Sequence, residues 1–418
     1  MKKRRVPRRR IKKKPRRKRW NPLPFLFLCL ILFLGIFYFY RPVVKTTPEN
    51  RPPQKGPLSE EQKTEDFDFF FNTLEENYPY FGIDEKFNKV SFLENKEYYR
   101  KLIEETKDDE SYFEALNKIA GNLGGEVKFL NKREYDEFLK YENISSLKLW
   151  IDTLKQETVK NRYQSMRITE ASEVPEELTM TTPVPNEVAY IKIKNFNPLL
   201  VDSDGKKIKD FIQNLKGYHS LIIDIRDNQG ISVEYFSENL LVPLSNNYYK
   251  STSTILEKQD QYTKYLDAYQ SDYFTNIPDK QDRNDLIKNY KVSKERADLF
   301  EYGKQYSIRV EPQKAYPFKG KVYILQNTKT KYAADTFSQF ANQTDFATTV
   351  GTTTGGNGVN ISNVFLTLPL SGYVFQMPVG MGLNADGSSN YELGTTPVLN
   401  YPDTDHLLNT LIRVIQSS

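Results

Sequence analysis

The chain has 418 residues, of which 38% are hydrophobic, and a formal net charge of +5. This length allows two or three domains, or one elaborated α/β domain with a helical extension. The single cysteine, Cys29, and the two histidines exclude a disulfide-rich scaffold and a Cys- or His-based metal centre, so no metal or cofactor is predicted. Residues 1–20 hold fourteen Lys and Arg and no acid, which leaves −9 on the rest of the chain.

Residues 23–40 predict a transmembrane anchor. The segment has no charge, is rich in Phe, Leu and Ile, ends in FYFY and follows Trp20, so it has the length and the interfacial aromatics of a short spanning helix. The basic tail, residues 1–22, places the N-terminus in the cytoplasm and the body outside. A cleaved signal peptide is the alternative, but the basic region is unusually long and no small-x-small cleavage site follows Tyr40.

The basic tail has two interpretations. Nucleic-acid binding is one, but the anionic inner leaflet of a bilayer explains the same charges without another partner. We therefore expect a single-pass protein of the cell membrane whose partners include the lipid bilayer and no nucleic acid. A body outside the cytoplasm without cysteine is more typical of bacteria than of eukaryotes.

Composition and periodicity then divide the body. Residues 41–57 are Pro-rich and predict an extended linker. Residues 58–130 predict an N-terminal helical subdomain, because SEEQ from Ser59 is typical of a capping box and Phe67, Phe70 and Phe71 begin an apolar helical face that ends before Pro79. Two further helices are predicted at 93–107 and 110–122. Residues 131–185 are interpreted as a connector.

Residues 186–418 predict an α/β core domain, since strands at 188–193 and 220–225 alternate with helices at 203–215 and 233–241. The polar insertion 248–306 is predicted to form peripheral helices. A strand at 322–325 then leads through a polar loop to a helix that starts at Ala333, and a strand at 346–350 ends at a Gly/Thr-rich turn. In an α/β enzyme, such a loop and helix start are where a nucleophile lies.

Several motifs occur in the order found in one peptidase family. They are DFDFFFNTLEENYPYF, LGGEVKFL, VAYIKIKNF, LIIDIRDNQG, PFKGKVYILQN, TKYAADTF, VGTTTGGNG, LPLSGYVFQMP and ELGTTPVL. Together they resemble the tail-specific, carboxyl-terminal-processing serine peptidases, including the tricorn-core branch, over residues 64–415. The resemblance implies a ClpP/crotonase-like spiral of ββα units, with the N-terminal helical subdomain beside it and one transmembrane helix before it.

The resemblance also implies where catalytic residues would lie, and three of these positions are changed. The family's serine nucleophile corresponds to Tyr332. The lysine base of one branch corresponds to Asn357, and the histidine of the other branch corresponds to Glu126. A phenol is a poor acyl acceptor for amide hydrolysis, and an asparagine is no base near neutral pH. Glu392 matches a supporting carboxylate and is a possible catalytic remnant.

Other positions of the implied site are kept. They are the candidate binding residues Arg226, Asn228, Gly230, Ala333, Gly355 and Gly356, whereas Ile231 replaces a second oxyanion-type glycine. We therefore expect a pseudopeptidase that binds a peptide or a protein partner through the inherited cleft. Two alternatives remain: an active serine peptidase with a displaced nucleophile, for which Ser338 is one candidate, and a non-enzymatic membrane scaffold. The sequence predicts neither the ligand nor the oligomeric state.

Overall fold

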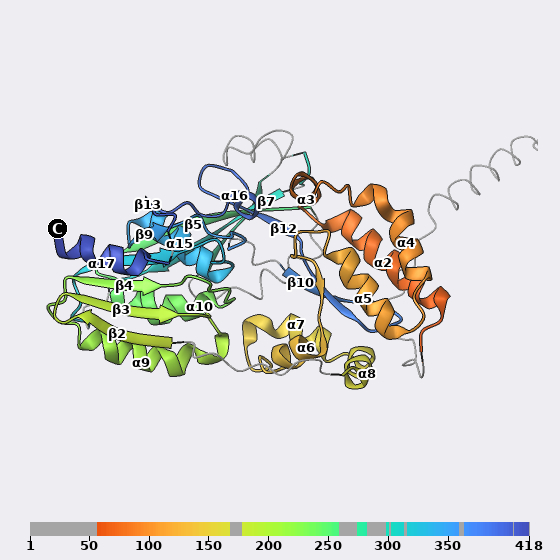
Figure 1. Cartoon of the computed structure of the whole chain (residues 1–418), viewed down its shortest axis with the longest axis horizontal. Helices are drawn as coiled ribbons and strands as arrows, with labels where there is room; N and C mark the ends of the chain where they lie inside the picture. The colour runs from red at the N-terminus through yellow and green to blue at the C-terminus, as the bar shows by residue number, and fades with distance from the viewer. Residues whose placement is uncertain are drawn as a thin grey trace, which may run out of the picture. The chain divides into compact units, whose positions relative to one another are not determined.

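Figure 1 presents the computed structural model of the chain. It describes residues 57–167, 178–258, 274–281, 298–300, 302–312, 316–358, 363–403 and 405–417. The predicted basic tail and transmembrane anchor, and the predicted linker up to residue 56, lie outside the described residues. Within the described part, no helix has both the length and the apolar character needed to cross a membrane.

Four helices open the described chain: α2 (Glu60–Asn77), α3 (Phe81–Asn88), α4 (Lys96–Glu104) and α5 (Asp109–Ala120). The predicted capping box is confirmed, because Gln62 N donates to Ser59 Oγ at 3.3 Å and Ser59 N donates to Gln62 Oε1 at 2.9 Å. These bonds satisfy backbone donors that the first helical turn leaves without partners. The aromatic face of α2 is buried in the core, as its spacing predicted.

Residues 131–165, which we interpreted as part of a connector, contain α6 (Lys132–Leu139), α7 (Lys148–Leu154) and α8 (Glu157–Ser165). These helices share one hydrophobic core with α2 to α5. A three-stranded antiparallel sheet completes that core and consists of β1 (Lys128–Phe129), β10 (Asn363–Thr367) and β11 (Val374–Pro378). Trp150 stacks on Phe365 with ring centroids 4.8 Å apart. The N-terminal helical unit is therefore completed by strands from the C-terminal part of the chain.

A six-stranded sheet confirms the predicted α/β core. Its strand order is β13-β9-β8-β4-β3-β2, in which β2 is antiparallel to β3 and the other neighbours are parallel. The strands span β2 (Leu178–Val184), β3 (Val188–Ile193), β4 (Ser220–Asp224), β8 (Lys321–Gln326), β9 (Thr348–Gly351) and β13 (Leu399–Asn400).

Helices cover both faces of this sheet (Figure 1). Ala189, Ile191 and Ile193 of β3 face a core shared with α9, α10 and α15, whereas Val188 and Tyr190 face the C-terminal helix α17. This alternation follows from the two-residue period of a strand. The helices span α9 (Val201–Gln213), α10 (Val233–Phe236), α11 (Val242–Leu244), α15 (Ala333–Thr344), α16 (Asn390–Leu393) and α17 (Leu407–Ser417).

The prediction of peripheral helices in the insertion 248–306 is wrong for its described residues. They form β5 (Tyr249–Glu257), β6 (Phe274–Gln281) and most of β7 (Tyr302–Val310), which join β12 (Gly380–Leu383) in a four-stranded sheet. The run STSTILE in β5 contains the β-branched residues Thr252, Thr254 and Ile255, which suit a strand better than a helix. The high charge of the whole insertion concealed this local preference.

A buried carboxylate links helix α2 to the turn between β10 and β11. Asp66 of α2 is fully buried, and its two oxygens accept hydrogen bonds from Leu370 N at 2.8 Å and Ser371 N at 2.7 Å. Burial raises the pKa of Asp66 from its ordinary 3.8 to about 6, although these hydrogen bonds act in the opposite direction.

The raised pKa of Asp66 predicts a pH dependence of stability. The folded protein binds the proton of the Asp66 carboxyl more tightly than the unfolded chain does. The stabilisation that protonated Asp66 gives the fold is therefore complete below pH 4 and is lost as the pH rises through 6. Asp66 should account for about 3 kcal/mol of this loss. Denaturant unfolding of the wild type and of Asp66→Asn at pH 4 and pH 7 measures it. The substitution should flatten the dependence, and equal pH dependence in both proteins would contradict the assignment.

Candidate functional site

Three loops meet at the carboxyl edge of the parallel strands. They are residues 225–230 after β4, 327–331 after β8 and 352–357 after β9. Backbone bonds tie them together: Lys331 N donates to Asn228 O at 2.9 Å, and Gly355 N donates to Thr330 O at 2.9 Å. Open α/β sheets bind ligands at this edge. The fold therefore places the sequence-predicted site where a site is expected on topological grounds.

Tyr332, which the sequence resemblance aligns with a nucleophile, has a strained backbone. It precedes helix α15 with φ 54° and ψ −127°, outside the regions that a bulky residue normally adopts. Such strain costs about 1–3 kcal/mol and is typical of the turn that presents a nucleophile between a strand and a helix. This strained turn between β8 and α15 presents the phenol of Tyr332.

The three residues that the resemblance places at changed catalytic positions, Glu126, Tyr332 and Asn357, lie together. This glutamate is 1% exposed. Asn357 Nδ2 donates to Glu126 Oε2 at 2.6 Å, and the Tyr332 phenol hydrogen-bonds to the same carboxylate. Lys331 Nζ lies 3.4 Å from Glu126 Oε1. We call Glu126, Lys331, Tyr332 and Asn357 the carboxylate cluster.

The electrostatics of the carboxylate cluster follow from burial. Burial raises the pKa of Glu126, while the charge of Lys331 and the hydrogen bonds from Lys331 and Asn357 lower it. Burial also raises the pKa of the Tyr332 phenol, and the neighbouring Glu126 raises it further. The phenol therefore stays protonated at neutral pH and acts as a hydrogen-bond donor. None of these pKa shifts generates an anionic nucleophile.

Aromatic residues that the sequence analysis did not select as site residues pack beside this cluster. Tyr80 is fully buried, and its hydroxyl donates to Gly380 O at 3.0 Å and lies 3.4 Å from Asn357 Oδ1. The ring of Tyr391 stacks on that of Tyr80 with centroids 4.1 Å apart. The hydroxyls of Tyr391 and Tyr78 both donate to Asp84, at 2.8 and 2.5 Å. Tyr78 and Tyr80 occur in the motif DFDFFFNTLEENYPYF, and Tyr391 precedes the motif ELGTTPVL. Their positions in or beside these motifs are the sequence feature that could have identified them.

The amide groups that could form an oxyanion hole already have acceptors. Ala333 N, which follows the nucleophile position, donates to Gly230 O at 3.0 Å. Gly230 N donates to Asn228 Oδ1 at 2.9 Å. An oxyanion hole needs such donors aimed at the developing charge. In this conformation, both amide hydrogens point to groups of the chain itself.

The loop around Gly230 has little freedom to rearrange. A Cβ atom at Gly230 would lie 2.0 Å from the backbone nitrogen of Phe196, so only glycine fits there. Asn228 is fully buried and donates through Nδ2 to Ile193 O at 3.0 Å. Close packing on one side and a buried amide on the other fix the loop.

The remaining predicted residues have other partners. Arg226 makes a two-pronged ion pair with the buried Asp224, with nitrogen–oxygen distances of 2.9 and 2.6 Å. Glu392 pairs with Lys86 at 2.5 Å. Gly356 has φ 71°, and its oxygen accepts from Tyr332 N at 3.3 Å. Gly355 packs against the aliphatic part of Lys331.

The two histidines, Ser338 and the metal-ligating residue types add no catalytic group to the carboxylate cluster within the described residues. His219 lies before β4, at the opposite end of that strand from the site, and His406 pairs with Asp403 at 2.9 Å. Ser338 is fully buried within α15, and its hydroxyl donates to Ala334 O at 3.3 Å. Within the described ranges, no group of His, Cys, Asp and Glu could hold a metal ion. The arrangement can hold hydrogen-bonding groups, but it offers no nucleophile paired with a base.

The strain at Tyr332 predicts an unusual order of stability. Tyr332→Gly and Tyr332→Ala both remove the ring, but only alanine keeps a Cβ atom at φ 54°. The glycine variant should be more stable by about 1 kcal/mol, because the relief of strain exceeds the entropy cost of glycine. Denaturant unfolding of both variants measures the difference.

The same pair of substitutions at Tyr98 is the control. Tyr98 is 55% exposed in helix α4, where alanine should be more stable than glycine by about 0.8–1 kcal/mol. If alanine is the more stable variant at both positions, the strained conformation assigned to Tyr332 is wrong.

Comparisons with known proteins agree with this fold. A family model described as Peptidase family S41 matches residues 187–400. A protein from Parabacteroides merdae ATCC 43184, provisionally described as a peptidase, aligns with a TM-score of 0.53 and 14% identity over 85% of this chain and 98% of its own. Mature CPAF complexed with lactacystin aligns with a TM-score of 0.52 and 11% identity over 86% and 98%.

At these identities the two structures show a shared fold. No protein with a curated description matches the chain in sequence. The family match extends over half of the chain, from before β3 to the end of β13, and includes the three loops of the site. The chain therefore belongs to peptidase family S41, which confirms the resemblance found in its sequence.

Proposed function

We propose that this S41-family protein does not hydrolyse peptides by a serine mechanism and instead binds a peptide or a protein partner at the inherited site. The observation that carries the proposal is the carboxylate cluster. The three positions that would supply a nucleophile and its base hold Tyr332, Asn357 and Glu126, and these side chains hydrogen-bond to one another.

Two physical arguments support the loss of hydrolysis. Serine catalysis needs an oxygen nucleophile whose proton a neighbouring base accepts, and the Tyr332 phenol faces a carboxylate that is engaged by Lys331 and Asn357. The transition state also needs free amide donors, and those of Gly230 and Ala333 have internal acceptors. Loss of both elements removes nearly all of the rate enhancement of such a site.

The location and the finer fold are part of the same proposal. The uncharged segment 23–40 would anchor the protein in the cell membrane with its body outside, and the core domain would follow the ClpP/crotonase-like spiral of ββα units. The first part rests on the sequence pattern. The second rests on the family resemblance.

Activity-based labelling tests the proposal. The full-length chain in detergent micelles is incubated with a fluorophosphonate probe and with quenched peptide substrates, and an active serine peptidase serves as the positive control for the reagents. We expect neither labelling nor hydrolysis above that of the heat-denatured protein, because the carboxylate cluster contains no serine.

Labelling of one serine together with peptide hydrolysis would overturn the proposal and establish the displaced-nucleophile alternative. Ser338→Ala then identifies whether that buried serine is the labelled residue. Labelling that resists this substitution would place the nucleophile at another serine.

A further inference from the structure

A groove in the N-terminal helical unit lies apart from the carboxylate cluster and shares no lining residue with it. Its volume is about 650 Å³, and it lies between α5, the start of α6 and the end of α8. A second hollow of about 520 Å³ adjoins it, since Asp109, Glu110, Arg162 and Ser165 line both. Two adjoining open hollows suit an extended ligand better than a compact one.

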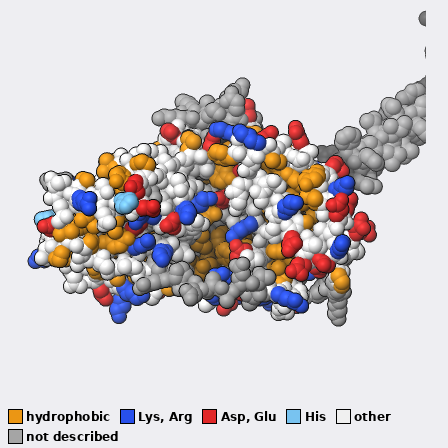
Figure 2. Space-filling model, viewed as in Figure 1, with side chains coloured by type: hydrophobic (Ala, Val, Ile, Leu, Met, Phe, Trp, Pro, Cys, Tyr) orange, Lys and Arg blue, Asp and Glu red, His pale blue; other side chains and the backbone are white. Residues whose placement is uncertain are grey.

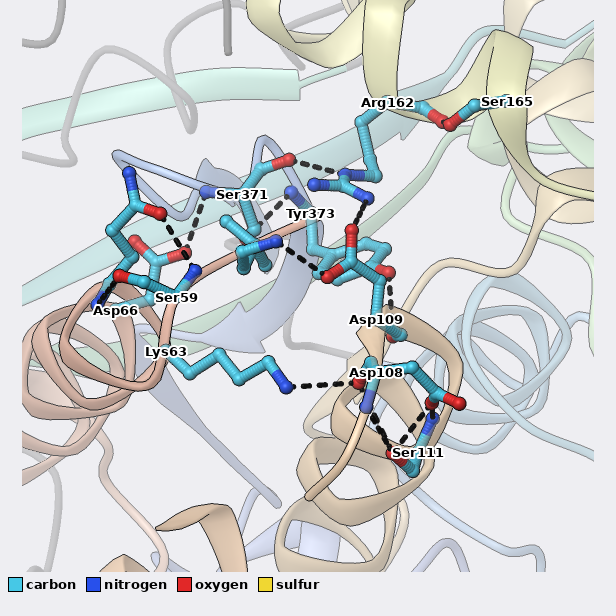
Figure 3. Close-up of polar contacts among 12 residues, drawn as sticks. Ser59, Lys63, Asp66, Asp108, Asp109, Ser111, Arg162, Ser165, Ser371 and Tyr373 are labelled. Carbon is cyan, nitrogen blue, oxygen red and sulfur yellow. Dashed lines mark hydrogen bonds and ion pairs between the residues drawn. The ribbon is translucent and has the colours of Figure 1, made fainter. Parts of the chain in front are cut away.

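The floor of the groove is apolar and fixed. Tyr373 is 2% exposed, and the ring of Phe113 packs against it with centroids 4.9 Å apart. Figure 3 shows Arg162 held between Asp109 and Ser371, through contacts of 2.6 Å to Asp109 Oδ2 and 2.7 Å to Ser371 O. The Arg162 guanidinium also lies 4.9 Å from the centre of the Tyr373 ring. A floor fixed in this way lowers the ordering cost of binding.

The two walls of the groove carry opposite charges. Glu110 and Glu114 project from α5, and Arg133 and Arg167 lie on the opposite side, on α6 and after α8. All four are exposed, and none forms an ion pair with another described residue. Figure 2 shows acidic and basic side chains interspersed over the face of the molecule that it presents. Charges left without a partner beside an apolar floor favour a ligand with complementary charges.

We propose that this groove binds an extended peptide segment of a partner protein. A hydrophobic side chain of the segment packs on Phe113, which Tyr373 supports from below. An acidic residue pairs with Arg133 and Arg167, and a basic residue pairs with Glu110 and Glu114. An extended chain advances about 3.3 Å per residue, which holds the acidic and the basic residue apart on either side of the hydrophobic anchor. This site is independent of the one proposed at the carboxylate cluster.

Fluorescence anisotropy with two labelled probe peptides tests the proposal. The probes are Gly-Lys-Ser-Leu-Ser-Glu-Gly and its order-reversed form Gly-Glu-Ser-Leu-Ser-Lys-Gly, both acetylated and amidated so that no terminal charge contributes. We expect the full-length chain to bind at least one order, and replacement of its leucine by serine to weaken binding at least tenfold. Higher ionic strength should weaken binding as well.

Variants of the protein locate the binding. Arg133→Ala combined with Arg167→Ala should weaken binding about tenfold, whereas Lys140→Ala should leave it unchanged. Lys140 is an exposed cation at the end of α6 that pairs with Glu137 and does not line the groove. Equal unfolding midpoints confirm that the variants are folded.

Two results would overturn the proposal: failure of both peptides to bind, or binding that is insensitive to the arginine substitutions. Sensitivity of binding to Tyr332→Gly instead would place the peptide at the carboxylate cluster. That last outcome separates failure of this inference from failure of the proposed function, because it supports binding at the inherited site while excluding the groove.

Discussion

The buried carboxylate of Glu126 is the constraint on which the candidate site depends. A carboxylate that is 1% exposed must receive hydrogen bonds or lose its charge, because burial of an unpaired charge is costly. Its donors come from distant parts of the chain: Asn357 from the turn after β9, and Lys331 and Tyr332 from the start of α15. Satisfying this one group therefore joins the N-terminal helical unit to the loops of the α/β core.

The same constraint accounts for the arrangement of the groups around Glu126. The turn at Tyr332 has a strained backbone, and Gly230 has a packing that no larger residue could reproduce. The side chains of Tyr332 and Asn357 are both aimed at Glu126. Tyr80 and Tyr391 stack beside them and extend the hydrogen-bonded region to Asp84. The structure thus combines a strained strand-to-helix turn with the bonding pattern of a packed interior.

Part of the fold, and the grouping of three candidate site residues, could be predicted from the sequence. Ordered motifs placed Glu126, Tyr332 and Asn357 at equivalent positions of one family, and the structure brings all three together although 231 residues separate Glu126 from Asn357. The alternating strands and helices of the core were also predicted, because each has a clear period. The strands β5, β6 and β7 were missed because a long, charged insertion conceals short runs of β-branched residues. Helices α6 to α8 looked like a connector because their partners are far away in sequence. Aromatic residues of α6 and α7 pack against β10, and Tyr163 of α8 hydrogen-bonds to Val374 of β11.

The most direct test of this account exchanges the two groups of its shortest contact. Asn357→Asp places a second carboxylate against Glu126, and at pH 8 it should lower the free energy of unfolding by about 2 kcal/mol or more. Adding Glu126→Gln restores one amide and one carboxylate, so the double variant should recover most of that loss. Aspartate tolerates the left-handed conformation of Asn357 as asparagine does, which keeps the backbone comparable. A double variant no more stable than Asn357→Asp alone would contradict the central place given to Glu126.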